Sequence, residues 1–352
     1  MGMNCKAGKG QLIRRLVELV GEDAVIADER ELVVYECDAY TLQRNPPTAV
    51  VLPRSTQEVT AVVRLCAKLG LPIIPRGAGT SLSGAVLAVD GGVMIALTRM
   101  NRVLNIDPRN RRALVEAGCV NAWITRDASV HGLFYAPDPS SQTACTIGGN
   151  IATNSGGPHT LKNGVTTNHV LGYEMVLPDG TIEWLGVEAN GGEEVPGFDL
   201  RGAAIGSEGM FGVVTRVLVR LMKTPQAFKT FLCIFESVDE ASQAVSGIIA
   251  AGIVPAALEM MDQPIIQAIE EAYHFGFPLD AGAVLIVELD GLAKGVEEQA
   301  KQVAERAKAA PAAPGAPAAP GAPAAPAAPA APAAPAAPAA PASSGPPHPN
   351  AT

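Results

Sequence analysis

Aromatic and charged residues are scarce in this sequence. Of its 352 residues only 4% are Phe, Trp or Tyr and 17% are charged, with a formal net charge of -9. Lys and Arg form no cluster, which argues against a nucleic-acid partner, because such a protein needs a basic face to displace counterions. No run of 18 apolar residues occurs, and Met1–Gly10 lacks an apolar segment, so neither a transmembrane helix nor a signal peptide is expected.

The six cysteines also lack the spacing of a metal site. They contain no Cys-x-x-Cys pair, so we expect neither a zinc nor an iron–sulfur centre and predict no metal ligands. Scattered cysteines of this kind are typical of reduced, mostly buried thiols. The sequence therefore predicts a cytoplasmic, acidic protein of enzyme size.

The C-terminal end explains the low charge. From about residue 309 the chain is a Pro-Ala-Ala repeat without Lys, Arg, Asp or Glu, and it holds about half of the 29 prolines. Such a repeat favours polyproline II and cannot pack a core, so we expect a disordered tail at 309–352. Two origins are open: a semi-rigid linker, or a truncated or frame-shifted reading of a GC-rich gene. The abrupt change of composition favours the second.

The rest of the chain predicts three regions. They are a helical leader at 1–46, a glycine-rich α+β domain at 47–224 and a smaller α+β domain at 225–308. Within them, Ser55 and Glu58 form a capping box for a helix that ends at Gly70. Pro178-Asp179-Gly180 predicts a hairpin turn between two strands.

Three glycine-rich segments carry the functional signal. The first, PRGAGTSLSG at 75–84, follows a predicted strand. Glycines with positive φ can turn successive N–H groups inward to form an anion nest, although an ordinary glycine turn is the alternative for a loop taken alone. The loop is neither a Rossmann fingerprint, which would need Gly at position 82, nor a Walker loop. The other two segments, 137–157 and 205–215, are rich in small and hydroxylated residues, which suits backbone packed against a large flat ligand.

Five motifs then follow one another in order. They are P-x-G-x-G-T-S at 75–81, P-D-P-S-S at 137–141, T-I-G-G-N-I-A-T-N-x-G-G at 146–157, K-x-G-V-T-x-N at 162–168 and G-S-E-G-x-x-G-V-V-T at 206–215. This series resembles the FAD-linked oxidase family, whose FAD domain is of the PCMH (vanillyl-alcohol-oxidase) type. Within that family it is most similar to the group of glycolate oxidase D subunits and D-lactate dehydrogenases. The resemblance implies an α+β fold: a PCMH-type FAD-binding domain of two α+β subdomains at 47–224 and a partial α+β cap at 225–308.

The resemblance also assigns FAD to the glycine-rich segments. The implied contacts to the pyrophosphate are Arg76, Gly77, Ala78, Gly79, Thr80 and Ser81. Those to the flavin and ribityl chain are Pro137, Asp138, Ser140, Ser141, Thr146, Gly148 and Gly149, with further contacts from Thr153, Asn154 and Gly156. Those near the adenine are Glu208, Gly209 and Val214. Thr80 stands where relatives with covalent flavin carry His, so we expect non-covalent FAD. Asn163 stands where relatives usually carry Tyr.

The implied activity is oxidation of a 2-hydroxy acid, such as glycolate or D-lactate, by hydride transfer to flavin N5. No catalytic residue is assigned. His159 and Lys162 either contact flavin or substrate, or are loop residues satisfied by backbone or solvent. His131, His169 and His274 are interpreted as structural or surface residues. The alternatives are an FAD-binding subunit or remnant without turnover, and an FAD enzyme that reduces its substrate. By resemblance, the partners would be a second flavin subunit and an iron–sulfur subunit.

Overall fold

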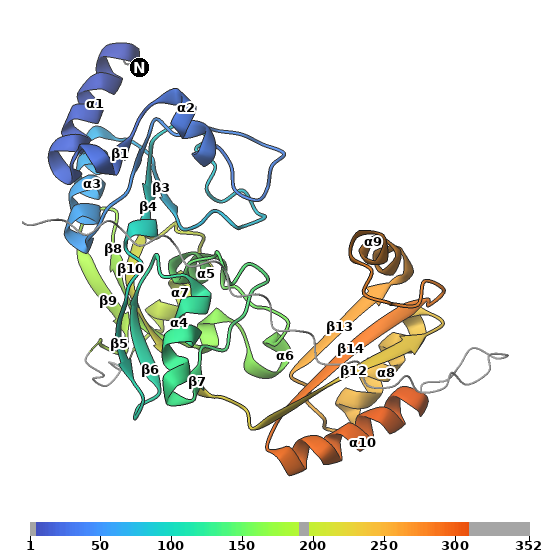
Figure 1. Cartoon of the computed structure of the whole chain (residues 1–352). Coiled ribbons are helices and arrows are strands. Elements are labelled where there is room, and N and C mark those ends of the chain that lie inside the picture. The colour runs from blue at the N-terminus through green and yellow to red at the C-terminus, as the bar shows by residue number, and fades with distance from the viewer. Residues whose placement is uncertain (1–4, 190–196, 310–352) are drawn as a thin grey trace, which may run out of the picture.

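Two lobes follow each other along the chain (Figure 1). The structure is a computed structural model and describes residues 5–189 and 197–309. The large lobe runs from α1 (Cys5–Val20) to β11 (Met222–Lys223), and the cap runs from β12 (Ala227–Phe235) to α10 (Ala293–Ala309). Within these ranges, no helix has both the length and the apolar character needed to cross a membrane. The predicted Pro-Ala tail lies outside the described residues, apart from Ala309.

The first sheet of the large lobe has the strand order β1-β2-β4-β3. Its strands are β1 (Val25–Ile26), β2 (Ala49–Val51), β4 (Val93–Ala96) and β3 (Ile73–Arg76). Apolar residues of α1 and α3 (Thr56–Leu69), such as Leu16 and Val59, pack against one face around Ile95. Leu32 of α2 (Glu29–Leu32) packs against the other face. Because β1 pairs with β2, the N-terminal leader is part of this sheet and is not only helical.

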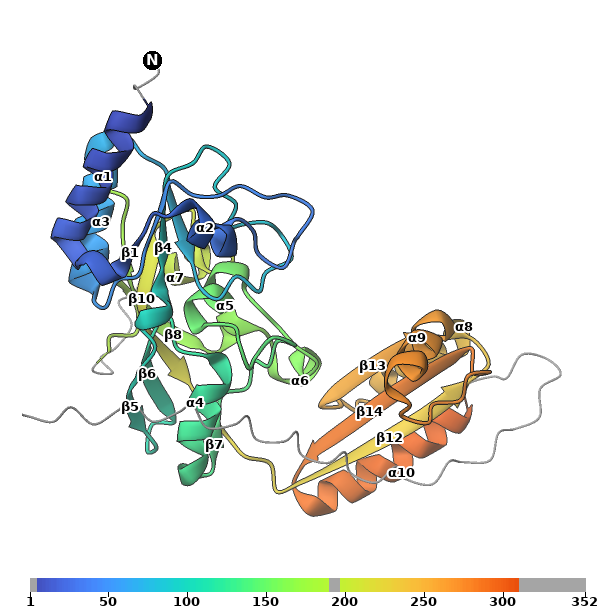
Figure 2. The same cartoon turned by 45° about the horizontal axis from the view of Figure 1, so that its top comes forward.

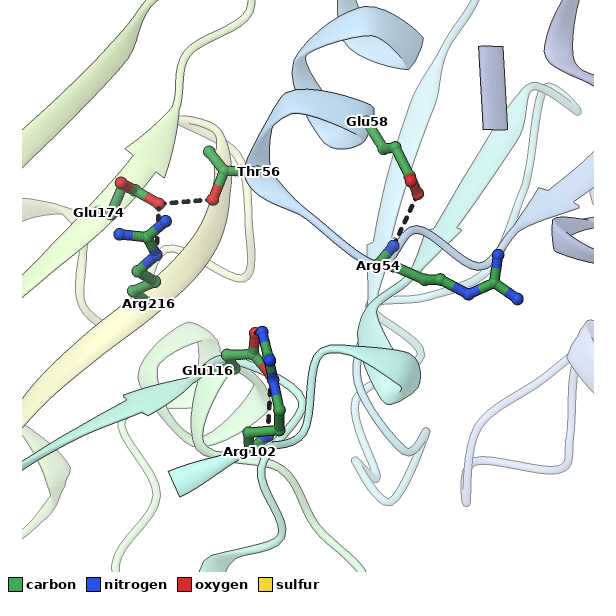
Figure 3. A network of polar contacts seen from close by, with 7 residues as sticks. All are labelled: Arg54, Thr56, Glu58, Arg102, Glu116, Glu174 and Arg216. Carbon is green, nitrogen blue, oxygen red and sulfur yellow. Dashed lines mark hydrogen bonds and ion pairs between the residues drawn. The ribbon is translucent and has the colours of Figure 1, made fainter. Parts of the chain in front are cut away.

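The capping box of α3 is present, with one change of partner. Ser55 Oγ accepts a hydrogen bond from the N–H of Glu58 at 3.2 Å. The Glu58 carboxylate accepts from the N–H of Arg54 at 2.8 Å, one residue earlier than the standard box (Figure 3). The helix ends at Gly70, whose φ of 63° lies in the left-handed region. Both ends of α3 therefore lie where the sequence predicted them.

The second sheet is antiparallel, in the order β5-β6-β10-β8-β9. Its strands are β5 (Val103–Asp107), β6 (Arg112–Glu116), β10 (Val213–Arg220), β8 (Val170–Val176) and β9 (Ile182–Gly186). The predicted hairpin turn joins β8 to β9, with Gly180 N–H donating to Leu177 O at 2.8 Å. The remaining elements of the lobe are α4 (Asn121–Ala128), β7 (Leu133–Phe134), α5 (Ile147–Thr153), α6 (Thr160–Asn163) and α7 (Leu200–Ala204). Ile124, Ile147 and Ile151 of α4 and α5 share a buried core with Tyr173 and Val217.

A half-buried carboxylate joins the two sheets (Figure 3). Glu174 on β8 accepts hydrogen bonds from Thr56 Oγ1 at 2.6 Å and from Thr215 Oγ1 at 2.7 Å. Thr56 begins α3 on the first sheet, whereas Thr215 lies on β10 of the second. The nearby guanidinium of Arg216, 3.5 Å from the same oxygen, balances the charge. Since a carboxylate that is largely withdrawn from water needs hydrogen-bond partners, these contacts fix one sheet relative to the other.

The cap is a three-stranded antiparallel sheet with helices on both faces (Figure 2). Its order is β12-β14-β13, with β14 (Ala283–Gly291) between β12 and β13 (Ala257–Asp262). Leu285, Val287 and Leu289 of β14 pack on one face against α8 (Val238–Ala250) and α10. Val284 packs on the other face against Ile266 of α9 (Gln263–Tyr273). The α+β composition predicted for residues 225–308 is therefore present.

Candidate cofactor-binding site

The three glycine-rich segments meet at one cleft of the large lobe. The first segment follows β3, the second surrounds α5, and the third precedes β10. Two adjoining hollows share lining residues from all three: Pro75, Gly77, Thr146, Gly149, Ala152 and Glu208. The larger hollow has a volume of about 390 Å³, which lies in the range of small-molecule sites.

Most of the sequence-predicted site residues line these hollows. The larger is lined by Gly77, Ala78, Gly79, Thr80, Ser81, Ser141, Thr146, Gly149, Thr153, Asn154, Gly156 and Glu208. The smaller adds Arg76, Gly148, Gly209 and Val214. Pro137, Asp138 and Ser140 line neither. The sequence did not single out Cys145, Asn150, Ala152 and Ser155, which also line the larger hollow. The helical spacing of α5 could have indicated Ala152, because it lies one turn from Gly148 and Gly149.

The loop after β3 has the properties of an anion nest. The N–H groups of Ala78, Gly79, Thr80 and Ser81 have no acceptor among the described residues. Gly79 has a φ of 74°, which an L-residue rarely adopts, and the Thr80 and Ser81 side chains line the same hollow. Unpaired N–H groups beside hydroxyls suit the oxygens of a phosphate or pyrophosphate.

The side chain of Arg76 packs against this loop at Gly79. Its guanidinium donates to Cys37 O at 2.9 Å and lies 5.6 Å from the centre of the Tyr35 ring. A Cβ added at Gly79 would lie 2.2 Å from Arg76 Nη2, so the guanidinium packs directly under the loop. Burial lowers the pKa of Arg76, but an arginine stays cationic at neutral pH because its ordinary pKa exceeds about 12. The loop therefore has a positive charge beneath its N–H groups.

Close packing between the segments fixes the shape of the cleft. A Cβ added at Gly77 would lie 2.2 Å from Thr146 Oγ1, so no larger residue fits there. The third segment is held against α5 by the N–H of Glu208, which donates to Ala152 O at 2.8 Å. The lining of the smaller hollow includes apolar side chains, among them Leu97, Met175 and Val214. A ligand with an anionic centre and a flat apolar end fits this arrangement, and FAD is such a ligand.

His159 and Lys162 contact carboxylates, not the cleft. His159 Nδ1 lies 2.5 Å from Asp138 Oδ2, and His159 Nε2 lies 3.1 Å from Glu288 Oε1. These two bonds raise the pKa of His159 to about 10, with the Asp138 bond contributing most. Lys162 forms an ion pair with Asp290. The backbone oxygen of Asp290 also accepts from Lys162 Nζ at 2.8 Å. The sequence did not indicate the carboxylate partners, Glu288 and Asp290, because they belong to the cap.

The other histidines have structural surroundings. His169 is fully buried, and its Nε2 donates to Asn163 O at 2.7 Å. His131 ends a 3-10 turn, Ser129–His131, and is exposed. His274 ends α9 with a φ of 56°. Within residues 5–189 and 197–309, no group of three His, Cys, Asp or Glu side chains is placed to hold a metal ion.

Comparison with known families identifies the two lobes. Residues 47–186 match the family described as FAD binding domain, and residues 224–325 match the C-terminal domain of FAD linked oxidases. The chain belongs to the FAD-linked oxidase family. FAD is thus the cofactor that the matched domain indicates, in agreement with the cleft. The third glycine-rich segment, with Glu208, lies between the two matched ranges.

Curated members of this FAD-linked oxidase family include enzymes of 2-hydroxy acids. The chain is 44% identical over 279 residues to glycolate oxidase subunit GlcD of Escherichia coli K12, covering 79% of this chain and 55% of that protein. It is 40% identical to the Bacillus subtilis 168 subunit, covering 82% and 61%. D-lactate dehydrogenase of Anaerostipes hadrus is 32% identical, with 84% and 62% covered. The chain thus spans a little more than half the length of these relatives.

Several solved structures have the same fold. Alkyldihydroxyacetonephosphate synthase superposes with a TM-score of 0.74 at 23% identity, covering 85% of this chain and 59% of that one. Substrate-bound p-cresol methylhydroxylase gives 0.72 at 19% identity, covering 86% and 65%. The predicted α+β fold, an FAD domain of two subdomains followed by a cap, is therefore confirmed.

Proposed function

We propose that the chain is an FAD-dependent oxidoreductase acting on a 2-hydroxy acid of the glycolate or D-lactate type. The cleft carries this proposal, because a nest of free N–H groups, a cation and an apolar slot lie in one lobe that matches an FAD binding domain. The substrate class is supported by the relatives, which include glycolate oxidase subunits and a D-lactate dehydrogenase.

The residues of the cleft have distinct roles in this proposal. The N–H groups of Gly79 to Ser81, with Arg76 behind them, bind the pyrophosphate. Met175 and Val214 provide an apolar slot for a ring. FAD, when bound, supplies the acceptor for the hydride of the substrate's α-carbon. The chain's own part is to hold this cofactor and exclude water from it.

We also propose that FAD is held without a covalent bond. Thr80 lines the larger hollow and cannot form the bond that a His would form there. Cys145 lines the same hollow, but burial raises the pKa of its thiol, so it is a poor nucleophile.

The absorption spectrum of the purified full chain tests the cofactor. We expect flavin bands that appear in the supernatant, not in the pellet, after acid precipitation. Flavin that stays with the pellet would contradict non-covalent binding. A well-folded, colourless chain that does not take up added FAD would contradict the proposal as a whole.

Anaerobic addition of glycolate or D-lactate tests the reaction. We expect the flavin bands to bleach with one of these acids and to remain with L-serine as a control. A second candidate, an FAD-binding subunit without turnover, is favoured by one observation: His159 and Lys162, the basic residues considered for the substrate, line neither hollow. A yellow protein that no 2-hydroxy acid bleaches would support this second candidate.

Partners and location are part of the same proposal. The word subunit in the names of two relatives favours a complex, in which a second flavin subunit and an iron–sulfur subunit would pass electrons onward. Free thiols at Cys66, Cys119 and Cys145 favour a reducing compartment such as the cytoplasm. Size-exclusion chromatography from the native source would show a larger complex if partners are bound.

A further inference from the structure

Two basic residues of the large lobe face two acidic residues of the cap. His159, directly before α6, and Lys162, within α6, lie three positions apart and so share one side of a helical turn. Glu288 and Asp290 lie two positions apart on β14, so their side chains share one face of that strand. The contacts are His159 to Glu288 at 3.1 Å, and Lys162 to Asp290, whose backbone oxygen also accepts from Nζ at 2.8 Å.

The contact between His159 and Glu288 is linked to the cofactor cleft through the other nitrogen of the His159 ring. His159 Nδ1 is bonded to Asp138 at 2.5 Å. Asp138 belongs to the Pro-Asp-Pro-Ser-Ser segment, and the neighbouring residues Pro139 and Ser141 line the larger hollow. Asp138 therefore connects a wall of the cleft, through one imidazole, to the central strand of the cap.

Within residues 5–189 and 197–309, no buried apolar cluster spans both lobes. The buried hydrophobic clusters of the described residues each lie within one lobe: three contain only large-lobe residues and two contain only cap residues. The connecting chain holds the lobes at one end, where Thr224 N–H donates to Gly132 O and Gln226 N–H to Gly291 O. Away from this connection, the side-chain contacts of His159 and Lys162 join the lobes where α6 approaches the cap sheet.

We propose that His159 and Lys162 are positioning residues that latch the cap onto the large lobe and couple its position to the Asp138 wall of the cleft. The charged groups in contact with His159 are Asp138 and Glu288. Lys162 and Asp290 form the neighbouring pair, and Glu259 of β13 lies on the same face of the cap sheet as Glu288. The latch itself does not depend on the identity of the substrate. Its effect on the cofactor rests on the proposed function.

A charge exchange in the full chain tests the latch. Lys162→Asp and Asp290→Lys should each oppose like charges and open the lobes, and the double variant should restore the pair. We would measure the distance distribution between lobes by small-angle X-ray scattering, and the deuterium exchange of α6 amides. Each single variant should speed exchange roughly two- to fivefold, the range of a partly exposed ion pair, and the double variant should return to the wild-type rate.

The control removes an equivalent ion pair inside the cap. Lys229 on β12 pairs with Glu297 of α10 at 3.4 Å, so Lys229→Met should leave the distance between lobes and the exchange of α6 unchanged. Single variants that behave like this control would overturn the latch, as would a double variant that opens further.

The coupling to the cleft has a separate readout. FAD added to flavin-free protein loses fluorescence when it binds, and His159→Gln should weaken this binding severalfold while Lys229→Met does not. Equal FAD affinity in both variants would overturn the coupling. A wild-type chain that binds no FAD would contradict the proposed function and, with it, the coupling. In that case the latch would be tested by the scattering and hydrogen-exchange results alone.

Discussion

At the scale of single residues, Gly77 sets the width of the cleft. Its missing Cβ leaves room for Thr146 Oγ1, which would lie only 2.2 Å away. We predict that Gly77→Ala destabilises the large lobe by about 1–3 kcal/mol, the usual cost of overpacking, and weakens FAD binding by roughly tenfold or more. Chemical denaturation and FAD titration would measure both effects. Gly247→Ala, in α8 where an added Cβ meets nothing within 4 Å, should leave both unchanged or slightly raise stability.

His159 predicts a pH dependence. Its folded pKa of about 10 lies above the ordinary value of 6.5, because two carboxylates favour the charged ring. The stabilisation is therefore complete below about pH 6.5, declines as the pH rises further, and is lost near pH 10. The difference in unfolding free energy between wild type and His159→Gln should follow this course in denaturation curves taken at several pH values. A difference that stays constant with pH would contradict the ion pairs.

At the scale of elements, two helices share one capping arrangement. Ser55 caps α3 and Ser237 caps α8, each accepting from the N–H of a Glu three residues later at 3.2 Å. In both helices, the carboxylate of that Glu accepts a hydrogen bond from the backbone N–H of the residue before the cap. This residue is Arg54 in α3 and Glu236 in α8. We predict that Ser55→Ala and Ser237→Ala each cost about 1 kcal/mol. Site-resolved hydrogen exchange should place the first loss in the large lobe and the second in the cap. Losses spread equally over both lobes would contradict this assignment.

Elements with a local cause were predictable, and contacts across the chain were not. The ends of α3 follow from Ser55 and Gly70, which act within a few residues. The sequence gives little indication of the strand β5, because its residues, Val-Leu-Asn-Ile-Asp, alternate only weakly between apolar and polar. The sequence indicated Arg76 as a cleft residue but could not show that its side chain turns toward Cys37. Asp138 was expected beside the flavin, yet it bonds to a histidine whose other partner lies 129 positions further along the chain.

At the scale of the whole molecule, the separate cores predict two unfolding transitions. Both tryptophans, Trp123 and Trp184, belong to the large lobe. Tryptophan fluorescence therefore reports the large lobe alone, whereas far-ultraviolet circular dichroism reports both lobes. We predict that added FAD raises the temperature of the fluorescence transition, since a ligand stabilises the part that binds it. The circular dichroism should show a second transition, from the cap, whose temperature FAD raises less. Coincident transitions that shift together would indicate one cooperative unit.

The alternation of side chains along β14 has a consequence for exchanging caps between relatives. Leu285, Val287 and Leu289 face the helices of their own lobe, while Glu288 and Asp290 face the other lobe. One strand thus encodes both the folding of the cap and its recognition of the large lobe, on alternate residues. A chimaera made by transplanting a cap should keep its orientation only if the donor's central strand carries acidic residues at these two positions. Insertion of one residue in this strand would disturb folding and recognition in the same step.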